Sequence, residues 1–204
     1  MENTSQNILC LSGRIASDIE YSHESHGRNF YSFKLETKRL SGTCDTINAL
    51  IGESVLNQHP IIPGDFIATN SELRSFNKKT DSGNKLIVSA FIKELTPAEN
   101  NTYENELYLT GTICKPPIYR KTPLGREICD IMLAINRRYG RSDYLPLITW
   151  GRNARIADEF TTGDVITIRG RVQSRDYTKI IDGEEITKTT YEVSVSSIAP
   201  YENE

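Results

Sequence analysis

Residues 166–177 read ITIRGRVQSRDY, and this alternating stretch decides the fold class. A β-strand sends successive side chains to opposite faces. One set of alternate positions is apolar or small and comprises Ile166, Ile168, Gly170 and Val172. The other set is polar, ends in an aromatic ring, and comprises Thr167, Arg169, Arg171, Gln173, Arg175 and Tyr177. The stretch therefore predicts a strand with one face on a hydrophobic core and the other face open to a ligand.

The residues around this strand predict a small barrel. Short alternating, β-branched runs predict further strands over residues 107–113, 128–136, 144–150 and 190–198. Residues 152–160 have apolar side chains at helical spacing, and residues 177–186, around Asp182-Gly183, form a predicted loop. Three strands, a short helix and two strands follow the order of the oligonucleotide-binding (OB) fold, a five-stranded Greek-key barrel. The predicted class is therefore all-β.

The chain contains the same pattern twice. Leu11-Ser-Gly-Arg-Ile15 matches Leu109-Thr-Gly-Thr-Ile113, and Ile62-Pro-Gly-Asp-Phe-Ile67 matches Thr161-Thr-Gly-Asp-Val-Ile166, with the offset growing by one between them. The shared order of such matches indicates two homologous domains. We predict tandem OB domains over residues 1–97 and 106–200, each with a short helix between strands three and four. A polar linker over residues 96–105 joins them.

Composition excludes several classes of protein. The net charge is −3, but basic residues outnumber acidic ones over residues 107–199, so a basic surface is local to the second copy. Neither a long apolar segment nor a signal peptide is visible, so we expect a cytoplasmic protein without membrane contact. The four cysteines form no CxxC pair, and the histidines, two of them flanking a predicted turn at 23–27, form no metal-binding pattern. We expect no metal and no cofactor.

The second copy resembles the bacterial single-stranded DNA-binding protein family over nearly its whole length. The stretches that carry the likeness are LTGTICKPPIYRKTPLGREICDIMLAINRRYG, YLPLITWGRNARIADEFTTGDVITIRGRVQSRDY and TYEVSVSSI. In that family, aromatic side chains at four places stack on DNA bases. Carried over position by position, the resemblance implies that these are Tyr139, Tyr144, Trp150 and Tyr177.

The residues themselves favour the same ligand. Tyr144 and Trp150 stand an even number of residues apart on one predicted strand, so they share a face with Ile148. Rings among cations suit unpaired nucleotides, because every base has a π-face and the phosphates follow the positive charge. The phosphate-binding residues that we predict are Arg137, Arg138, Arg169, Arg171 and Arg175. Stacking does not distinguish DNA from RNA, so RNA stays open as a ligand.

The first copy keeps the scaffold but changes the outer face. Where the second copy has Arg169, Arg171, Gln173, Arg175 and Tyr177, the first has Asn70, Glu72, Arg74, Phe76 and Lys78. Ile51 is matched to Trp150, and Asp45 to Tyr144, so we predict a degenerate and acidic domain. Phe76 and Arg74 form a thinner candidate site with Phe30 and the neighbouring lysines Lys78 and Lys79, while an ordinary rim position for Phe76 is the open alternative.

The leading hypothesis is sequence-tolerant binding of single-stranded DNA in replication, recombination and repair, without enzymatic activity. By analogy with family members that have two OB domains per chain, we expect a homodimer with four OB domains. The sequence ends at Tyr201-Glu-Asn-Glu204, so we do not expect the acidic recruitment tail that the family usually carries. Two rivals remain: a primosome-like scaffold subunit with weak nucleic-acid affinity, and a nuclease, for which we find no carboxylate cluster with suitable spacing.

Overall fold

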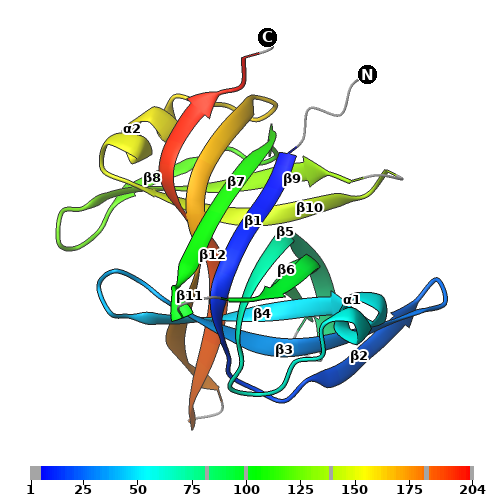
Figure 1. The fold of residues 1–204 in the computed structure, drawn as a ribbon. Helices are drawn as coiled ribbons and strands as arrows, with labels where there is room; N and C mark the ends of the chain where they lie inside the picture. The colour runs from blue at the N-terminus through cyan, green and yellow to red at the C-terminus, as the bar shows by residue number, and fades with distance from the viewer. Residues whose placement is uncertain (1–5, 81–82, 99–100, 138–139, 182–183, 203–204) are drawn as a thin grey trace.

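The computed structural model describes residues 6–80, 83–98, 101–137, 140–181 and 184–202, which form two barrels built mostly from strands (Figure 1). The first barrel comprises β1 Gln6–Ile15, β2 Glu20–Ser25, β3 Arg28–Lys38, β4 Cys44–Gly52, α1 Glu53–Gln58, β5 Phe66–Thr80 and β6 Gly83–Pro97. The second comprises β7 Glu104–Ile113, β8 Ile118–Lys121, β9 Glu127–Asn136, β10 Ser142–Trp150, α2 Arg152–Asp158, β11 Val165–Ile181 and β12 Glu184–Pro200. Within these residues, no helix is long and apolar enough to cross a membrane.

Each barrel closes through its first strand, which changes partners along its length. In the second barrel, β7 pairs with β11 and then, at Thr112 and Ile113, with β9. This change of partner brings the backbones of β7 and β9 close together at Gly111, where an added Cβ would lie 2.6 Å from the carbonyl oxygen of Ala134. Gly13 stands at the equivalent point of β1 and approaches the carbonyl oxygen of Glu36 in the same way. The glycine that the two copies share is therefore required by barrel closure.

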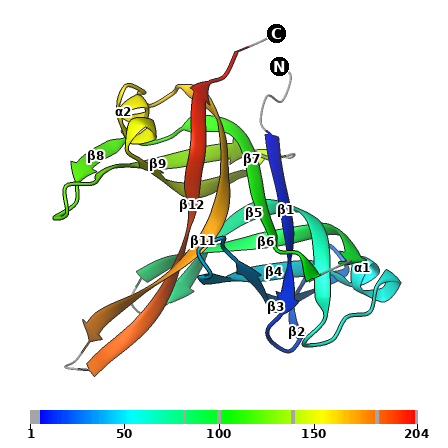
Figure 2. The ribbon, with the colours of Figure 1, turned by 60° about the vertical axis from the view of Figure 1, so that its left-hand side comes forward.

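The alternation of the opening stretch is confirmed on its core side, where Ile166, Ile168 and Val172 are fully buried. The prediction of a loop over residues 177–186 was wrong, because β11 and β12 stay paired from Ile166 and Pro200 out to Ile181 and Glu184. Figures 1 and 2 show this hairpin projecting beyond the second barrel as a two-stranded arm. An arm has no barrel core to cover, so its sequence lacks the apolar alternation by which strands are recognised.

Two further details differ from the predicted order of elements. Each barrel has a sixth short strand, β2 or β8, which extends the sheet beyond β3 or β9. These edge strands are exposed on almost every residue and show no amphipathic pattern. The helix α2 ends at Asp158 rather than at residue 160, and it places Ala154 and Ala157 in the core.

The two barrels share one continuous sheet. Strands β1 and β7 pair antiparallel at the centre of the molecule, with Leu9 directly opposite Leu107 (Figure 2). These two leucines occupy the same place in the repeated pattern, so the pairing relates the barrels by an approximate two-fold axis. The strand order β6-β5-β1-β7-β11-β12 runs unbroken from one barrel to the other.

A mirrored pair of polar contacts ties the barrels together on either side of this axis. Asp45 of the first barrel accepts a hydrogen bond from the backbone N–H of Ser174 at 2.8 Å, and Asp143 of the second accepts one from Ser75 at 2.6 Å. In return, Ser174 Oγ accepts from the backbone of Thr46 at 3.1 Å, and Ser75 Oγ from that of Tyr144 at 2.7 Å. The symmetry matches Tyr144 with Thr46, so the predicted match with Asp45 was one residue out of register.

Candidate nucleic-acid interface

Two of the predicted stacking residues lie on the outer face of the second barrel. Along β10, Leu145, Leu147 and Thr149 are buried on the core side, whereas Tyr144 and Trp150 on the other side are 48% and 40% exposed. Ile148 shares their face but is buried, so it forms part of the floor between the two rings. The face is therefore open at two aromatic positions, with an apolar surface between them.

The position of Trp150 is determined by its place at the end of a strand. It is the last residue of β10 and stands opposite Ile128 of β9. The next residue, Gly151, has a φ of 54° and turns the chain into α2, a conformation that favours glycine. The backbone N–H of Gly151 donates to the carbonyl oxygen of Glu127 at 2.9 Å, which holds this turn against β9. The TWG motif thus keeps the indole on the surface.

The arm carries the third described ring. Tyr177 on β11 is 43% exposed, and Arg175 on the same side of the strand is also exposed. Further back along the strand, Arg169 is exposed and lies over the ring of Tyr108 on β7, with its Cζ 5.7 Å from the ring centre. Arg171 is half-buried, and its Nε has no hydrogen-bond partner among the described residues.

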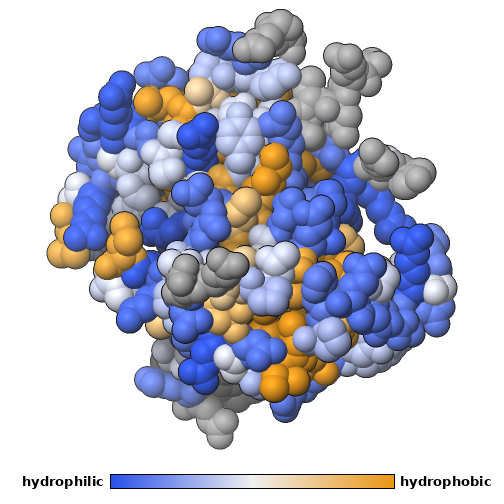
Figure 3. Space-filling model, in the orientation of Figure 1, coloured by the Kyte–Doolittle hydropathy of each residue, from blue (hydrophilic) through white to orange (hydrophobic). Residues whose placement is uncertain are grey.

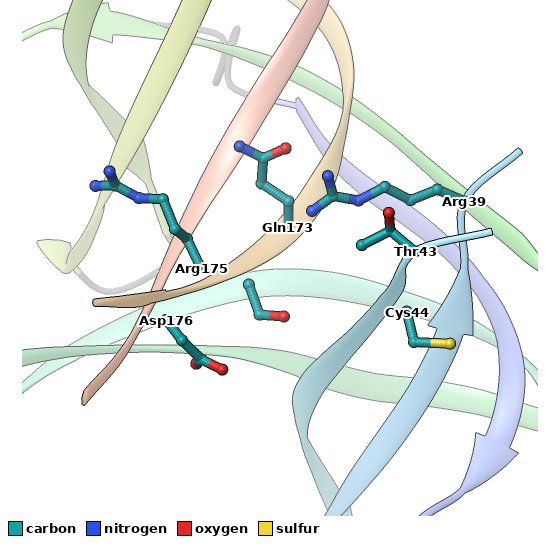
Figure 4. A pocket seen from close by; sticks show the side chains of 7 residues that line it. Arg39, Thr43, Cys44, Gln173, Arg175 and Asp176 are labelled. Carbon is teal, nitrogen blue, oxygen red and sulfur yellow. The ribbon is translucent and has the colours of Figure 1, made fainter. Parts of the chain in front are cut away.

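Gln173 departs from the predicted open face. It stands on the same side of β11 as the arginines, yet its side chain is buried and donates to Glu192 at 2.8 Å. The cause is the first barrel, whose β3–β4 turn lies against this part of the arm. Arg39, Thr43, Gln173 and Arg175 line a hollow of about 360 Å³ between them (Figure 4). Figure 4 shows Gln173 and Arg175 on one side of the strand and Asp176 on the other.

Of the remaining predicted cations, Arg137 is engaged inside the protein. Its Nε lies 3.1 Å from Oδ2 of Asp143, whose side chain is fully buried. Burial lowers the pKa of the Arg137 guanidinium and raises the pKa of the Asp143 carboxyl, while the attraction between the two groups opposes both shifts. Arg137 therefore supports the contact between the barrels and is less available to a phosphate. Arg138 and Tyr139 lie outside the described residues.

The two candidates on β5 lie beside the second barrel. Phe76 is exposed and follows Ser75, the residue that contacts the backbone of Tyr144. Arg74 is half-buried, pairs with Glu72, and lies over the ring of Phe91 with its Cζ 5.0 Å from the ring centre. Sequence reasoning matched both residues to the arm positions of the second copy, but it did not place Arg74 on an aromatic ring.

Sequence reasoning missed the contribution of β8 to the outer face. Ile118 is exposed and stands opposite Asp130 of β9, on the side of the sheet that carries Trp150. Arg120 on the same side pairs with Asp130 at 2.8 Å. The only signal for this strand was the short run IYRK after two prolines, which is too brief to show a period.

Comparison with known proteins points to one family. The model of the single-strand binding protein family matches residues 104–201. Single-stranded DNA-binding protein A of Bacillus subtilis is 31% identical over 80 residues, which are 36% of this chain and 46% of that protein. Single-stranded DNA-binding protein 2 of Streptococcus agalactiae is 31% identical over 82 residues, which are 37% of this chain and 63% of that protein. The match thus spans less than two thirds of these relatives.

Both barrels have a counterpart among solved structures. The single-stranded DNA binding protein from Thermus aquaticus superposes with a TM-score of 0.79, covering 98% of this chain and 95% of that chain. The two sequences are 18% identical, so the likeness is one of fold. The predicted arrangement of tandem OB folds is confirmed.

Proposed function

We infer that this chain, which belongs to the single-strand binding protein family through residues 104–201, binds single-stranded DNA without sequence preference. The observation that carries the proposal is the exposure of Tyr144 and Trp150 on the outer face of an OB barrel. Large rings that could have been buried are instead open to solvent, where bases can stack on them. We place this role in replication, recombination and repair in the cytoplasm, as a binding protein rather than an enzyme.

In the proposed mechanism, the aromatic rings bind the bases and the arginines bind the phosphates. Tyr144, Trp150 and Tyr177 each stack on a base, and each stack contributes about 1–3 kcal/mol. Stacking needs only a π-face, so the affinity depends little on sequence. Arg175 is the best-placed phosphate ligand, because it is exposed and stands beside Tyr177 on the arm. Each neutralised phosphate adds about −0.7 to the slope of log K against log salt.

We also propose that two chains associate through the outer face of the central strands, which gives a homodimer with four OB barrels. Ile8 on β1 is exposed and stands opposite Tyr108 on β7. Figure 3 shows hydrophobic residues interrupting the polar surface along these strands. An apolar patch with a polar rim is typical of an interface between proteins. Sedimentation equilibrium is expected to give twice the chain mass of 23.1 kDa, and a monomer would contradict this assembly.

Fluorescence of Trp150 tests the function directly, because it is the only tryptophan in the chain. Titration with an oligothymidylate at low salt is expected to quench its emission, and added salt to reverse the effect. A Tyr144→Ala, Tyr177→Ala double variant, which keeps the tryptophan, is expected to bind about 30-fold or more weakly if each stack is worth at least about 1 kcal/mol. Absence of quenching together with capture of replication proteins would favour the scaffold alternative.

A further inference from the structure

We propose that Glu127 is a positioning residue for the binding of single-stranded DNA, because it holds the turn that presents the Trp150 ring to a base. The inference rests on the proposed function of the chain. Glu127 acts through the backbone of Gly151 and through the side chains of Tyr119 and Arg155, rather than on the DNA itself.

Glu127 lies behind the face that carries Trp150. It begins β9 and precedes Ile128, the residue that stands opposite Trp150 on β10. Because side chains alternate along β9, Glu127 points to the same side as the buried Cys129. The helix α2 lies against this end of the barrel and contacts β8 and β9 (Figure 2). Glu127 therefore meets the turn between β10 and α2 from the core side, whereas bases approach from the outer side.

Three contacts form a closed loop around Gly151, the residue that follows Trp150. The backbone N–H of Gly151 donates to the carbonyl oxygen of Glu127 at 2.9 Å. The carbonyl oxygen of Gly151 accepts from the backbone N–H of Arg155 at 3.2 Å. The two side chains complete the loop, because the guanidinium of Arg155 pairs with the carboxylate of Glu127. Gly151 is therefore held by two residues that also hold each other.

This restraint matters because Gly151 has an uncommon backbone conformation, with a φ of 54° and a ψ of −120°. A glycine has the widest choice of conformations, so contacts from outside the residue must select this one. Trp150 is joined to Gly151 directly. Pairing with β9 holds the tryptophan on one side, and the turn holds it on the other. A change in the turn is expected to change the direction of the indole.

The same carboxylate anchors β8. Tyr119 Oη donates to Glu127 at 2.7 Å. This hydrogen bond and the charge of Arg155 lower the pKa of the Glu127 carboxyl against the opposing effect of burial, so the group is ionised at neutral pH. The strand β8 ends the sheet and carries the exposed Ile118 on the outer face. Glu127 thus joins the edge strand and the helix that border the face of Trp150.

The first barrel has a comparable carboxylate beside a turn without a tryptophan. Gly52 ends β4 where Trp150 ends β10. The next residue, Glu53, begins α1 and accepts hydrogen bonds from Asn29 Nδ2 at 3.2 Å and from Tyr31 Oη at 3.3 Å. Glu53 therefore provides a matched control, because it also accepts from a tyrosine and a second side chain next to a short helix.

The affinity for a labelled oligothymidylate tests the proposal. Glu127→Ala removes a negative charge, so a purely electrostatic role would make a polyanion bind more tightly. We expect binding about fivefold weaker instead, because a misdirected indole loses part of its stacking. In a Trp150→Ala background, the same substitution is expected to cause no further loss, since the ring through which it acts is absent. Unchanged or tighter binding by Glu127→Ala, or an equal loss in the Trp150→Ala background, would overturn the proposal.

The decay of Trp150 fluorescence anisotropy in the free chain gives a second measurement that needs no DNA. Glu127→Ala is expected to increase the fast motion of the indole. Arg155→Ala is expected to do the same, and it replaces an exposed side chain, so it keeps the test decisive if the first variant does not fold. Indole motion that is unchanged in the folded variants would overturn the proposal.

Glu53→Ala separates positioning from a general loss of stability. It is expected to leave both the affinity and the indole motion unchanged, and a loss of affinity equal to that of Glu127→Ala would overturn the proposal. The wild-type chain separates this inference from the function. If it binds the oligomer and Glu127→Ala binds equally well, the positioning role fails alone. If it does not bind, the proposed function fails together with this inference.

Discussion

Removal of the Asp45 carboxylate is expected to destabilise the protein far more than removal of a similar carboxylate from the surface. Asp45 is 0% exposed, accepts two hydrogen bonds of 2.6 Å from Arg39, and caps the backbone N–H of Ser174 in the other barrel. Asp45→Ala leaves the guanidinium without its partner and the N–H of Ser174 without an acceptor.

The expected loss is about 3 kcal/mol of unfolding free energy. Breaking a buried pair typically costs about 3–5 kcal/mol, and an orphaned N–H costs about 1–3 kcal/mol. Arg39 is 25% exposed, so water relieves part of this cost and the total stays near the lower end. For a chain of this size, each kcal/mol shifts the melting temperature by about 2–4 °C. Asp45→Ala is therefore expected to lower the melting temperature by about 6–12 °C.

The matched control is Asp130→Ala, which breaks the surface pair with Arg120. The two side chains are 39% and 52% exposed, so this pair is expected to contribute about 0–1 kcal/mol. Differential scanning calorimetry of both variants at neutral pH measures the difference. Equal shifts of the melting temperature would refute the reasoning that burial and the contact between barrels give Asp45 its effect.

Two further predictions concern the second barrel. Gly111→Ala places a methyl group 2.6 Å from a carbonyl oxygen of β9, and it is expected to lower the free energy of unfolding in urea by about 1–3 kcal/mol. Gly52→Ala is the control, because the nearest contact of its added methyl group is 3.7 Å and its effect is expected to be nearly neutral. Equal losses of stability would refute the close-approach argument. Burial raises the pKa of Asp143, so the folded state binds the carboxyl proton more tightly than the unfolded chain does. The stability that this proton contributes is therefore lost as the pH rises from the pKa of the unfolded chain, near 4, through the pKa of the folded state. Asp143→Asn is expected to remove this loss, which melting curves between about pH 4 and 7 would show as a flatter profile.

The outer face illustrates what local pattern can and cannot provide. Strand alternation placed Tyr144 and Trp150 on one face, because the side-chain period of a strand is independent of its partners. It did not reveal that the ring of Phe30 covers Gly52, because these residues are distant in sequence and become neighbours only when β3 and β4 pair. Sequence matching therefore made the first barrel look emptier of rings than it is.

The sequence by itself determined the all-β class, the repeated pattern and the core side of β11, since each of these follows from the spacing of side chains along the chain. Only the tertiary structure decided that Gln173 is covered, that Arg137 is drawn to a buried carboxylate, and that β11 and β12 extend as an arm. The physical reason is that the burial and pairing of a residue depend on which distant part of the chain packs against it. In this protein that part is often the other barrel, whose position is set by the pairing of β1 with β7.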